Sequence, residues 1–141
     1  MSITEIIDDY REKRKRTARI YHRYQEAKDK AATPPSSGNY TEIKTKGTGS
    51  REDLYIKMIN AREKWQAAAL DELEARQRLF DLFIMLDDPE EMEVANAHFL
   101  DGEKADETAA RLGTSERQIF RKLKTGLYHL EAIAAGEDRE K

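Results

Sequence analysis

The chain has 141 residues and a formal net charge of −3, and its charged and hydrophobic fractions are equal at 38%. The charged fraction is well above the ~25% of typical globular domains, which excludes a large globular core and favours long exposed helices with a narrow buried face. The absence of cysteine excludes a disulfide framework and a thiolate zinc site. The sequence lacks an apolar run near the ~20 residues of a membrane span and lacks a signal-peptide core, so we expect a cytoplasmic protein without a membrane partner.

The first predicted element is a long amphipathic helix over residues 1–32, which contain no glycine or proline. Ser2 or Thr4 can cap its start, with Glu5 in the first turn. One face carries apolar or small side chains at helical spacing: Ile3, Ile7, Tyr10, Thr17, Tyr21 and Tyr24. A basic run, residues 11–16, lies between them. We interpret this run as a solvated face and the tyrosines as packed on a partner helix, with a nucleic-acid contact as the alternative.

Residues 33–50 are predicted to be a flexible linker, because Pro34 and Pro35 end the first helix and three glycines follow. A coiled-coil-like helix is expected over residues 51–87, with Ser50 as its N-cap. Its seam alternates steps of four and three residues: Leu54, Met58, Ala61, Trp65, Ala68, Glu72, Ala75, Leu79, Leu82 and Leu86. The sequence leaves open whether the first helix covers this seam in a hairpin or a second chain covers it in a homodimer through the long helices.

The apolar face of this helix is expected to widen at Phe80, Phe83 and Ile84, where the C-terminal unit could dock. The next helix starts at a strong signal, because Asp88 can act as N-cap, Pro89 fits the first helical position and acids follow. Capping accounts for these carboxylates, so a metal or acid–base site is not expected there. The C-terminal unit is predicted over residues 88–135, and Gly136 is expected to end its last helix before a charged tail, 136–141.

Two helices around a tight turn are predicted over residues 105–130. The first carries Ala105, Ala109 and Leu112 on one face and ends at Gly113, and Ser115 caps the second. The second helix has one apolar stripe, formed by Ile119, Leu123, Leu127 and Leu130. This is the pattern of a helix-turn-helix, which places its second helix in the major groove of DNA. A plain helical hairpin with a solvated basic face has the same spacing and remains the alternative.

The run Gly102–Leu130 resembles the helix-turn-helix of region 4 of bacterial sigma factors and of related phage regulators. The matching residues are Gly102, Glu107, Ala109, Leu112, Gly113, Ser115, Ile119, Leu123 and Leu127. Three positions depart from that family: Lys104 replaces a Ser/Thr N-cap, Thr108 replaces an aliphatic core residue and Gly126 replaces a common alanine. More loosely, the order of linker, long charged helix, acidic break and helix-turn-helix is similar to small phage late-transcription regulators.

The fold is therefore expected to be all-α, a long helical hairpin or coiled coil followed by a helix-turn-helix. The resemblance implies a sequence-specific duplex DNA-binding protein that regulates phage transcription in a bacterial host cell, with RNA polymerase as a further candidate partner. Base-reading roles are expected for Arg117, Gln118, Arg121 and Lys122, because arginine and glutamine match guanine and adenine edges. Phosphate contacts are expected for Lys104, Arg111, Ser115, Lys124 and Thr125.

Two other functional classes stay open. One is the DNA-recognition (small) subunit of a phage packaging terminase, which would assemble into a ring. The other is a sigma-like adaptor whose helix-turn-helix binds RNA polymerase and not DNA. An enzyme, a cofactor and a metal are not expected, because the sequence has no glycine-rich nucleotide loop and no nucleophile motif, and its three histidines lack ligand spacing.

Overall fold

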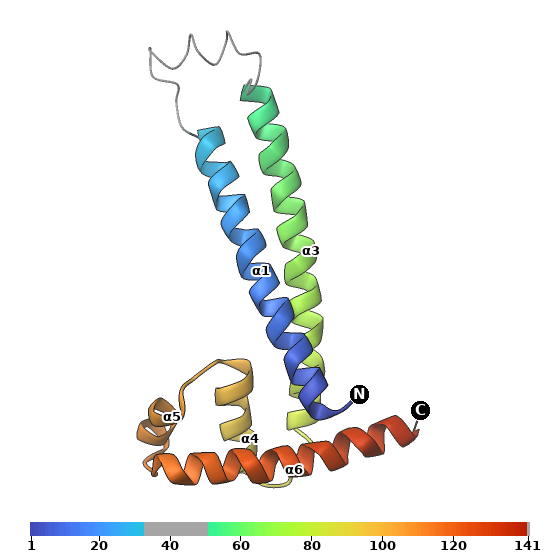
Figure 1. Cartoon of the computed structure of the whole chain (residues 1–141), viewed down its shortest axis with the longest axis vertical. Coiled ribbons are helices and arrows are strands. Elements are labelled where there is room, and N and C mark those ends of the chain that lie inside the picture. The colour runs from blue at the N-terminus through green and yellow to red at the C-terminus, as the bar shows by residue number, and fades with distance from the viewer. Residues whose placement is uncertain (33–50, 141) are drawn as a thin grey trace. The chain divides into compact units, whose positions relative to one another are not determined.

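A computed structural model describes residues 1–32 and 51–140, which form helices and turns without a strand (Figure 1). The predicted all-α class is confirmed. The linker 33–50 and the Ser50 cap lie outside the described residues. No described helix is both long and apolar enough to cross a bilayer. The elements in chain order are α1 (Ile3–Ala32), α3 (Arg51–Phe83), α4 (Pro89–Ala95), the π-helix η1 (Asn96–Leu100), α5 (Ala105–Leu112) and α6 (Glu116–Glu140).

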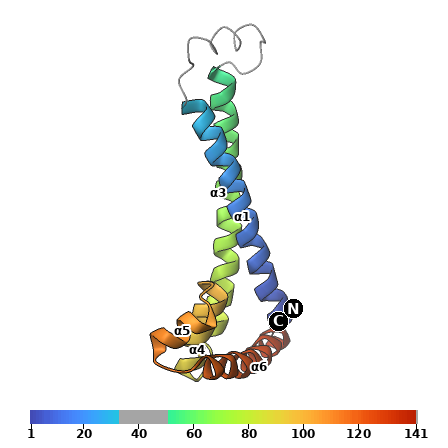
Figure 2. The same ribbon diagram turned by 60° about the vertical axis from the view of Figure 1, so that its left-hand side comes forward.

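The chain divides into two compact units, each of which contains part of α1 and part of α3. The hairpin unit is Glu12–Glu72, and the C-terminal unit comprises Met1–Arg11 and Leu73–Lys141. Within the hairpin unit, Figures 1 and 2 show α1 and α3 side by side.

In the hairpin unit, α1 covers the predicted seam of α3. The Thr17 hydroxyl donates a hydrogen bond to the Ala68 carbonyl oxygen at 3.1 Å. Further along, the Tyr24 ring stacks on the Trp65 ring with centroids 5.5 Å apart, and the Tyr21 ring lies 5.1 Å from the same indole. Because positions rise along α1 as they fall along α3, the two helices are antiparallel. The packing of Tyr21 and Tyr24 on a partner helix is confirmed. The seam of this unit is contacted by α1 of the same chain, with Ala68 buried and its other members half-buried.

In the C-terminal unit, the start of α1 and the end of α3 share one core with α4, η1, α5 and α6. This core includes Ile3, Ile7, Leu79, Leu82, Phe83, Val94, Leu100, Ile119 and Leu130, all at most 4% exposed. The predicted stripe of α6 is confirmed, because Ile119, Leu123 and Leu130 are buried and Leu127 packs against them. The backbone N–H of Ile3 donates to the Glu131 carboxylate at 3.2 Å, so α6 also meets the N-terminal end of α1.

A polar cluster fastens α1 and α3 to the end of η1 inside the C-terminal unit. The Tyr10 hydroxyl donates to the Leu100 carbonyl oxygen at 3.2 Å. The Arg76 guanidinium donates to the same carbonyl at 3.1 Å, to the Tyr10 oxygen at 3.2 Å and to the Asp101 carboxylate at 3.1 Å. The bond that Arg76 donates to Tyr10, and after it the bond to Asp101, raise the pKa of Arg76 above its ordinary value. The cluster brings two hydrogen-bond donors to the Leu100 carbonyl oxygen at the helix end.

The end of α3 differs from the prediction. The helix stops at Phe83, and residues 85 and 86 make shorter turns, with the N–H groups of Met85 and Leu86 donating to residues 82 and 83. Pro89 holds the preceding Asp88 in an extended conformation (φ −90°, ψ 114°), so the helix cannot run on to Asp87 and into α4 without a break. Of the three residues expected to widen the docking face, Phe83 is fully buried, whereas Phe80 and Ile84 are 41% and 52% exposed, so the expectation is wrong for these two.

The expected stop at Gly136 is also wrong, because α6 continues to Glu140. A glycine inside a helix costs at most about 1 kcal/mol relative to alanine, which is too little to end a helix between good helix formers such as Ala135 and Glu137. The π-helix Asn96–Leu100 was not predicted. There the Asp101 N–H donates to the Asn96 carbonyl oxygen at 3.1 Å, which accommodates one extra residue in the turn.

Candidate nucleic-acid interface

The turn between α5 and α6 has the geometry that its residues predict. Gly113 adopts the left-handed conformation (φ 66°), and its N–H bonds to the Ala109 carbonyl oxygen as a C-cap. The Ser115 hydroxyl oxygen then accepts a bond from the Gln118 N–H at 3.2 Å, which caps the start of α6. Three residues, 113–115, therefore connect the two helices, as in a helix-turn-helix.

The departures from the sigma-like pattern are accommodated locally. Lys104 stands at the N-cap of α5 without a side-chain cap. Thr108 is only 1% exposed, and its hydroxyl donates to the Lys104 carbonyl oxygen at 3.1 Å, so the buried hydroxyl is satisfied. A methyl group at Gly126 would lie 3.9 Å from the Cβ of Glu91, which is an ordinary contact. The helix pair is therefore compatible with all three residues.

The first half of α6 exposes a basic face opposite its buried stripe. Arg117, Arg121 and Lys124 are exposed and follow one another at spacings of four and three residues, which places them on one side of the helix. Together with Gln118 and Phe120 they line a surface depression. Four of the predicted DNA-contacting residues are thus brought together: Arg117, Gln118, Arg121 and Lys124.

Two aromatic residues of this face were missed by the sequence reasoning. Phe120 is 55% exposed among the basic side chains, and Tyr128 is 77% exposed one turn beyond Lys124. Aromatic residues in an amphipathic helix are usually counted with the core, but these two lie off the stripe of Ile119 and Leu123. Plotting each residue by its angle around the helix would have placed Tyr128 with the outer face and Phe120 at its edge.

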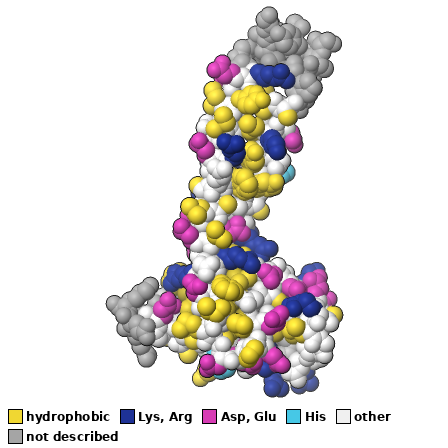
Figure 3. Space-filling model, turned by 180° about the vertical axis from the view of Figure 1, so that it is seen from behind, with side chains coloured by type: hydrophobic (Ala, Val, Ile, Leu, Met, Phe, Trp, Pro, Cys, Tyr) yellow, Lys and Arg dark blue, Asp and Glu magenta, His cyan; other side chains and the backbone are white. Residues whose placement is uncertain are grey.

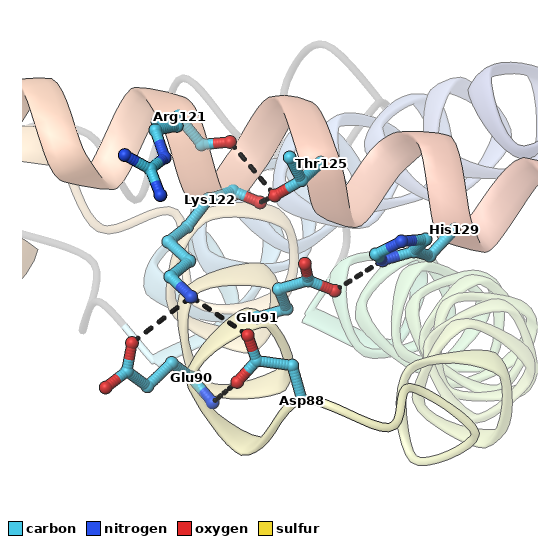
Figure 4. Close-up of polar contacts among 7 residues, drawn as sticks. All are labelled: Asp88, Glu90, Glu91, Arg121, Lys122, Thr125 and His129. Carbon is cyan, nitrogen blue, oxygen red and sulfur yellow. Dashed lines mark hydrogen bonds and ion pairs between the residues drawn. The ribbon is translucent and has the colours of Figure 1, made fainter.

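The acidic start of α4 holds α6 through Lys122 and His129 (Figure 4). The Lys122 ammonium lies 2.9 Å from a carboxylate oxygen of Asp88 and 3.3 Å from one of Glu90. The bond from Lys122 and the Glu90 N–H lower the pKa of Asp88, and the two carboxylates raise the pKa of Lys122. The next residue, Glu91, is 5% exposed and contacts His129 Nδ1 at 2.7 Å.

These ion pairs change the interpretation of two predicted site residues. Lys122 would have to leave Asp88 and Glu90 to reach a base, so we assign it to the packing of α6 on α4. Arg111 lies 2.9 Å from the Glu93 carboxylate and 3.3 Å from that of Glu103, and these bonds, the first above all, raise its pKa. Arg111 is therefore engaged between α5 and α4. The acids after Asp87 do more than cap a helix, which the sequence reasoning did not foresee.

Three residues with predicted phosphate contacts remain: Thr125, Lys104 and Ser115. The Thr125 hydroxyl donates to the Arg121 carbonyl oxygen at 3.1 Å, within its own helix. Lys104 is exposed at the start of α5, and Ser115 lies in the turn. In residues 1–32 and 51–140, no three His, Asp or Glu side chains are grouped closely enough to hold a metal ion.

Comparison with known proteins gives no match, whether to a family model, to a curated protein or to a solved structure.

Proposed function

We propose that this protein binds duplex DNA and reads its sequence in the major groove with the first half of α6, residues 116–125. One observation carries the proposal: the exposed basic face of Arg117, Arg121 and Lys124 follows directly on a helix-turn-helix turn. In proteins with this motif, the N-terminal residues of the second helix contact the base edges.

The side chains on this face suit base recognition. Arginine can donate two hydrogen bonds to guanine, and glutamine can pair with adenine, which gives base-reading roles to Arg117, Gln118 and Arg121. The Phe120 ring offers an apolar contact for a thymine methyl group. Lys124, with Lys104 and Ser115 at the turn, would bind phosphates and so fix the position of the helix on the duplex.

The acidic net charge does not oppose this role, because charge distribution matters more than the total. Two carboxylates beside α6, those of Asp88 and Glu90, are paired with the Lys122 ammonium. This pairing reduces the repulsion that these two carboxylates would exert on the phosphate backbone. The resemblance to sigma region 4 and to phage regulators extends the proposal to transcription regulation in a phage-infected bacterium.

The test is selection of duplex fragments from a random pool at moderate salt, followed by binding titrations on the enriched sequence. Arg121→Ala should weaken binding to the enriched sequence by ~1–3 kcal/mol and affect random duplex less. Arg117→Ala/Arg121→Ala should abolish the enrichment. The matched control is Lys57→Ala/Arg62→Ala, which removes two exposed cations from α3 and should leave binding unchanged.

Equal losses on enriched and random duplex would contradict sequence reading by α6. No enrichment, together with no duplex affinity at low salt, would contradict DNA binding altogether, because phosphate contacts are strongest there. A pull-down against RNA polymerase would then test the adaptor alternative.

A further inference from the structure

Helix α3 carries a second apolar face that nothing in the described chain covers. Its members are Ile56, Ile59, Leu70, Leu73, Phe80 and Ile84, which are between 39% and 59% exposed. With Glu63, Gln66 and Gln77 they form one register that alternates steps of three and four residues from 56 to 84. Ile84 keeps this register because its N–H bonds to the Phe80 carbonyl oxygen. We call this face the outer stripe.

The outer stripe lies on the side of α3 away from the seam that α1 covers. At 100° per residue, the two sets of positions are centred about 150° apart around the helix axis. Helix α1 therefore cannot reach the outer stripe while it packs on Trp65 and Ala68. Figure 3 shows hydrophobic side chains exposed along the long helices among the charged ones.

The size and period of the outer stripe indicate a helical partner. Six side chains of roughly 150–200 Å² each, about half exposed, present on the order of 500 Å² of apolar surface. This total is divided into three groups by Glu63, Gln66 and Gln77, and it is the apolar share that an interface of about 800 Å² per partner would need. Alternating steps of three and four over four heptads are the pattern of a coiled-coil contact.

We propose that the outer stripe is the interface with a second copy of this chain, in which the two α3 helices pack antiparallel. The stripe is complementary to itself when the two copies are centred between residues 71 and 72. The pairs are then Leu70 with Leu73, Gln66 with Gln77, Ile59 with Ile84, and Glu63 with Phe80, while Ile56 at the end of the stripe lies opposite Asp87. Like chemistry meets like chemistry in the three pairs of leucine, glutamine and isoleucine.

A parallel arrangement in register is disfavoured by charge. It would place Glu63 directly against Glu63 of the second copy in the core of the interface, where like charges repel. The antiparallel register separates these two carboxylates. The assembly differs from a homodimer through the seam of Leu54 and Trp65, because α1 already occupies that seam.

The first experiment is sedimentation equilibrium of the full chain over a hundredfold dilution from about 100 μM, without DNA. For the wild-type chain we expect the mass of two chains at high concentration. The variant Leu70→Glu/Leu73→Glu should be monomeric. Its helical circular dichroism should be unchanged, since both side chains are more than half exposed. The control, Lys57→Glu/Lys64→Glu, changes more charge on the same helix outside the outer stripe and should remain dimeric. A monomeric wild type, a dimeric Leu70→Glu/Leu73→Glu, or a monomeric control would each overturn the proposal.

The second experiment tests the orientation and uses the absence of cysteine from the chain. Chains carrying Leu70→Cys and Leu73→Cys are mixed and oxidised. In the antiparallel register these positions face each other, so the mixed disulfide should form in preference to either homodimer. Crosslinking of Leu70→Cys with itself and not with Leu73→Cys would overturn the antiparallel register. Neither experiment involves DNA, so its result is independent of the proposed function.

Discussion

The two units of the molecule differ in how completely they bury their side chains. The largest fully buried side chains all belong to the C-terminal unit: Tyr10, Phe83, Ile3, Leu79, Leu82, Ile119, Leu130, Val94 and Thr108. In the hairpin unit, the buried residues are small, namely Thr17, Ala31 and Ala68. Two helices alone cover one seam only, whereas several helices can enclose a core.

This difference gives the C-terminal unit a role that the hairpin unit lacks. In the C-terminal unit, the ends of α1 and α3 are part of a core that also holds α6, so the proposed DNA-reading face rests on a packed frame. The outer stripe, which we propose as the surface for association, is exposed in both units and does not depend on that core.

Leu82→Ala should destabilise the protein far more than Leu54→Ala, although both leucines belong to the same seam of α3. Leu82 is 2% exposed in the core, so its truncation should cost ~2–5 kcal/mol. The cost combines the lost free energy of burying the side chain with the penalty for the cavity that remains. Leu54 is only partly buried in the hairpin unit, and its truncation should cost less than about 1.5 kcal/mol. Urea denaturation of both variants measures the difference.

The control for this pair is Leu70→Ala, which should change stability little at a concentration where the chain is monomeric. If Leu54→Ala and Leu82→Ala lowered the free energy of unfolding equally, the contrast between the units would be contradicted.

Tyr10→Phe should cost about 1 kcal/mol, the usual net value of one buried hydrogen bond. The substitution removes the bond to the Leu100 carbonyl oxygen and the acceptor for Arg76, while the ring stays in the core. The matched control is Tyr128→Phe, because that ring is 77% exposed and its loss of a hydroxyl should leave the free energy of unfolding unchanged. A Tyr10→Phe protein as stable as wild type would show that the cluster contributes nothing net.

Much of the fold could be predicted from the sequence because the relevant signals are local. Helical spacing, the Asp88–Pro89 start and the Gly113–Ser115 turn depend on side chains a few residues apart, and the structure agrees with each. The burial of the seam by α1 depends on contacts across more than fifty residues, such as that of Thr17 with Ala68, and so the sequence left two partners open.

The candidate site was predictable only in part for the same reason. Arg117 and Lys122 look alike in the sequence, five residues apart on one helix. Only the packing of α4 on α6 distinguishes them, because it brings Asp88 and Glu90 to the Lys122 ammonium. The sequence predicts that these acids cap a helix, and Asp88 does so. Their ion pairing with Lys122 could not be predicted in the same way, because that residue lies more than thirty positions away in the sequence.

Two glycines of the C-terminal unit should respond oppositely to substitution by alanine. Gly113→Ala should destabilise by about 1 kcal/mol, because φ is +66° there and a side chain is strained in the left-handed region. Gly126→Ala should stabilise by roughly 0.5–1 kcal/mol, because it lies inside α6 and its Cβ would meet only an ordinary contact. Thermal melts of the two variants give the signs, and two shifts of equal sign would contradict the assigned backbone conformations.

The smallest effect is expected from the partly exposed pair of Asp88 and Lys122, because ion pairs near the surface contribute little. The bond from Lys122 lowers the pKa of Asp88, so its contribution to stability is present above the unfolded aspartate pKa of about 3.9 and is lost as the pH falls through the lower folded value. The two carboxylates raise the pKa of Lys122, so the contribution of its charge to stability is present below the unfolded lysine pKa of about 10.4 and is lost as the pH rises through the higher folded value.

Asp88→Asn keeps a capping side chain but removes the charge. Its melting temperature should therefore lie slightly below that of wild type at neutral pH, and the gap should close in strong acid, where wild-type Asp88 is also neutral. A gap that stayed constant into strong acid would contradict a charge-dependent contribution of Asp88, because both its pairing with Lys122 and its bond from the Glu90 N–H should weaken when the carboxylate is neutralised.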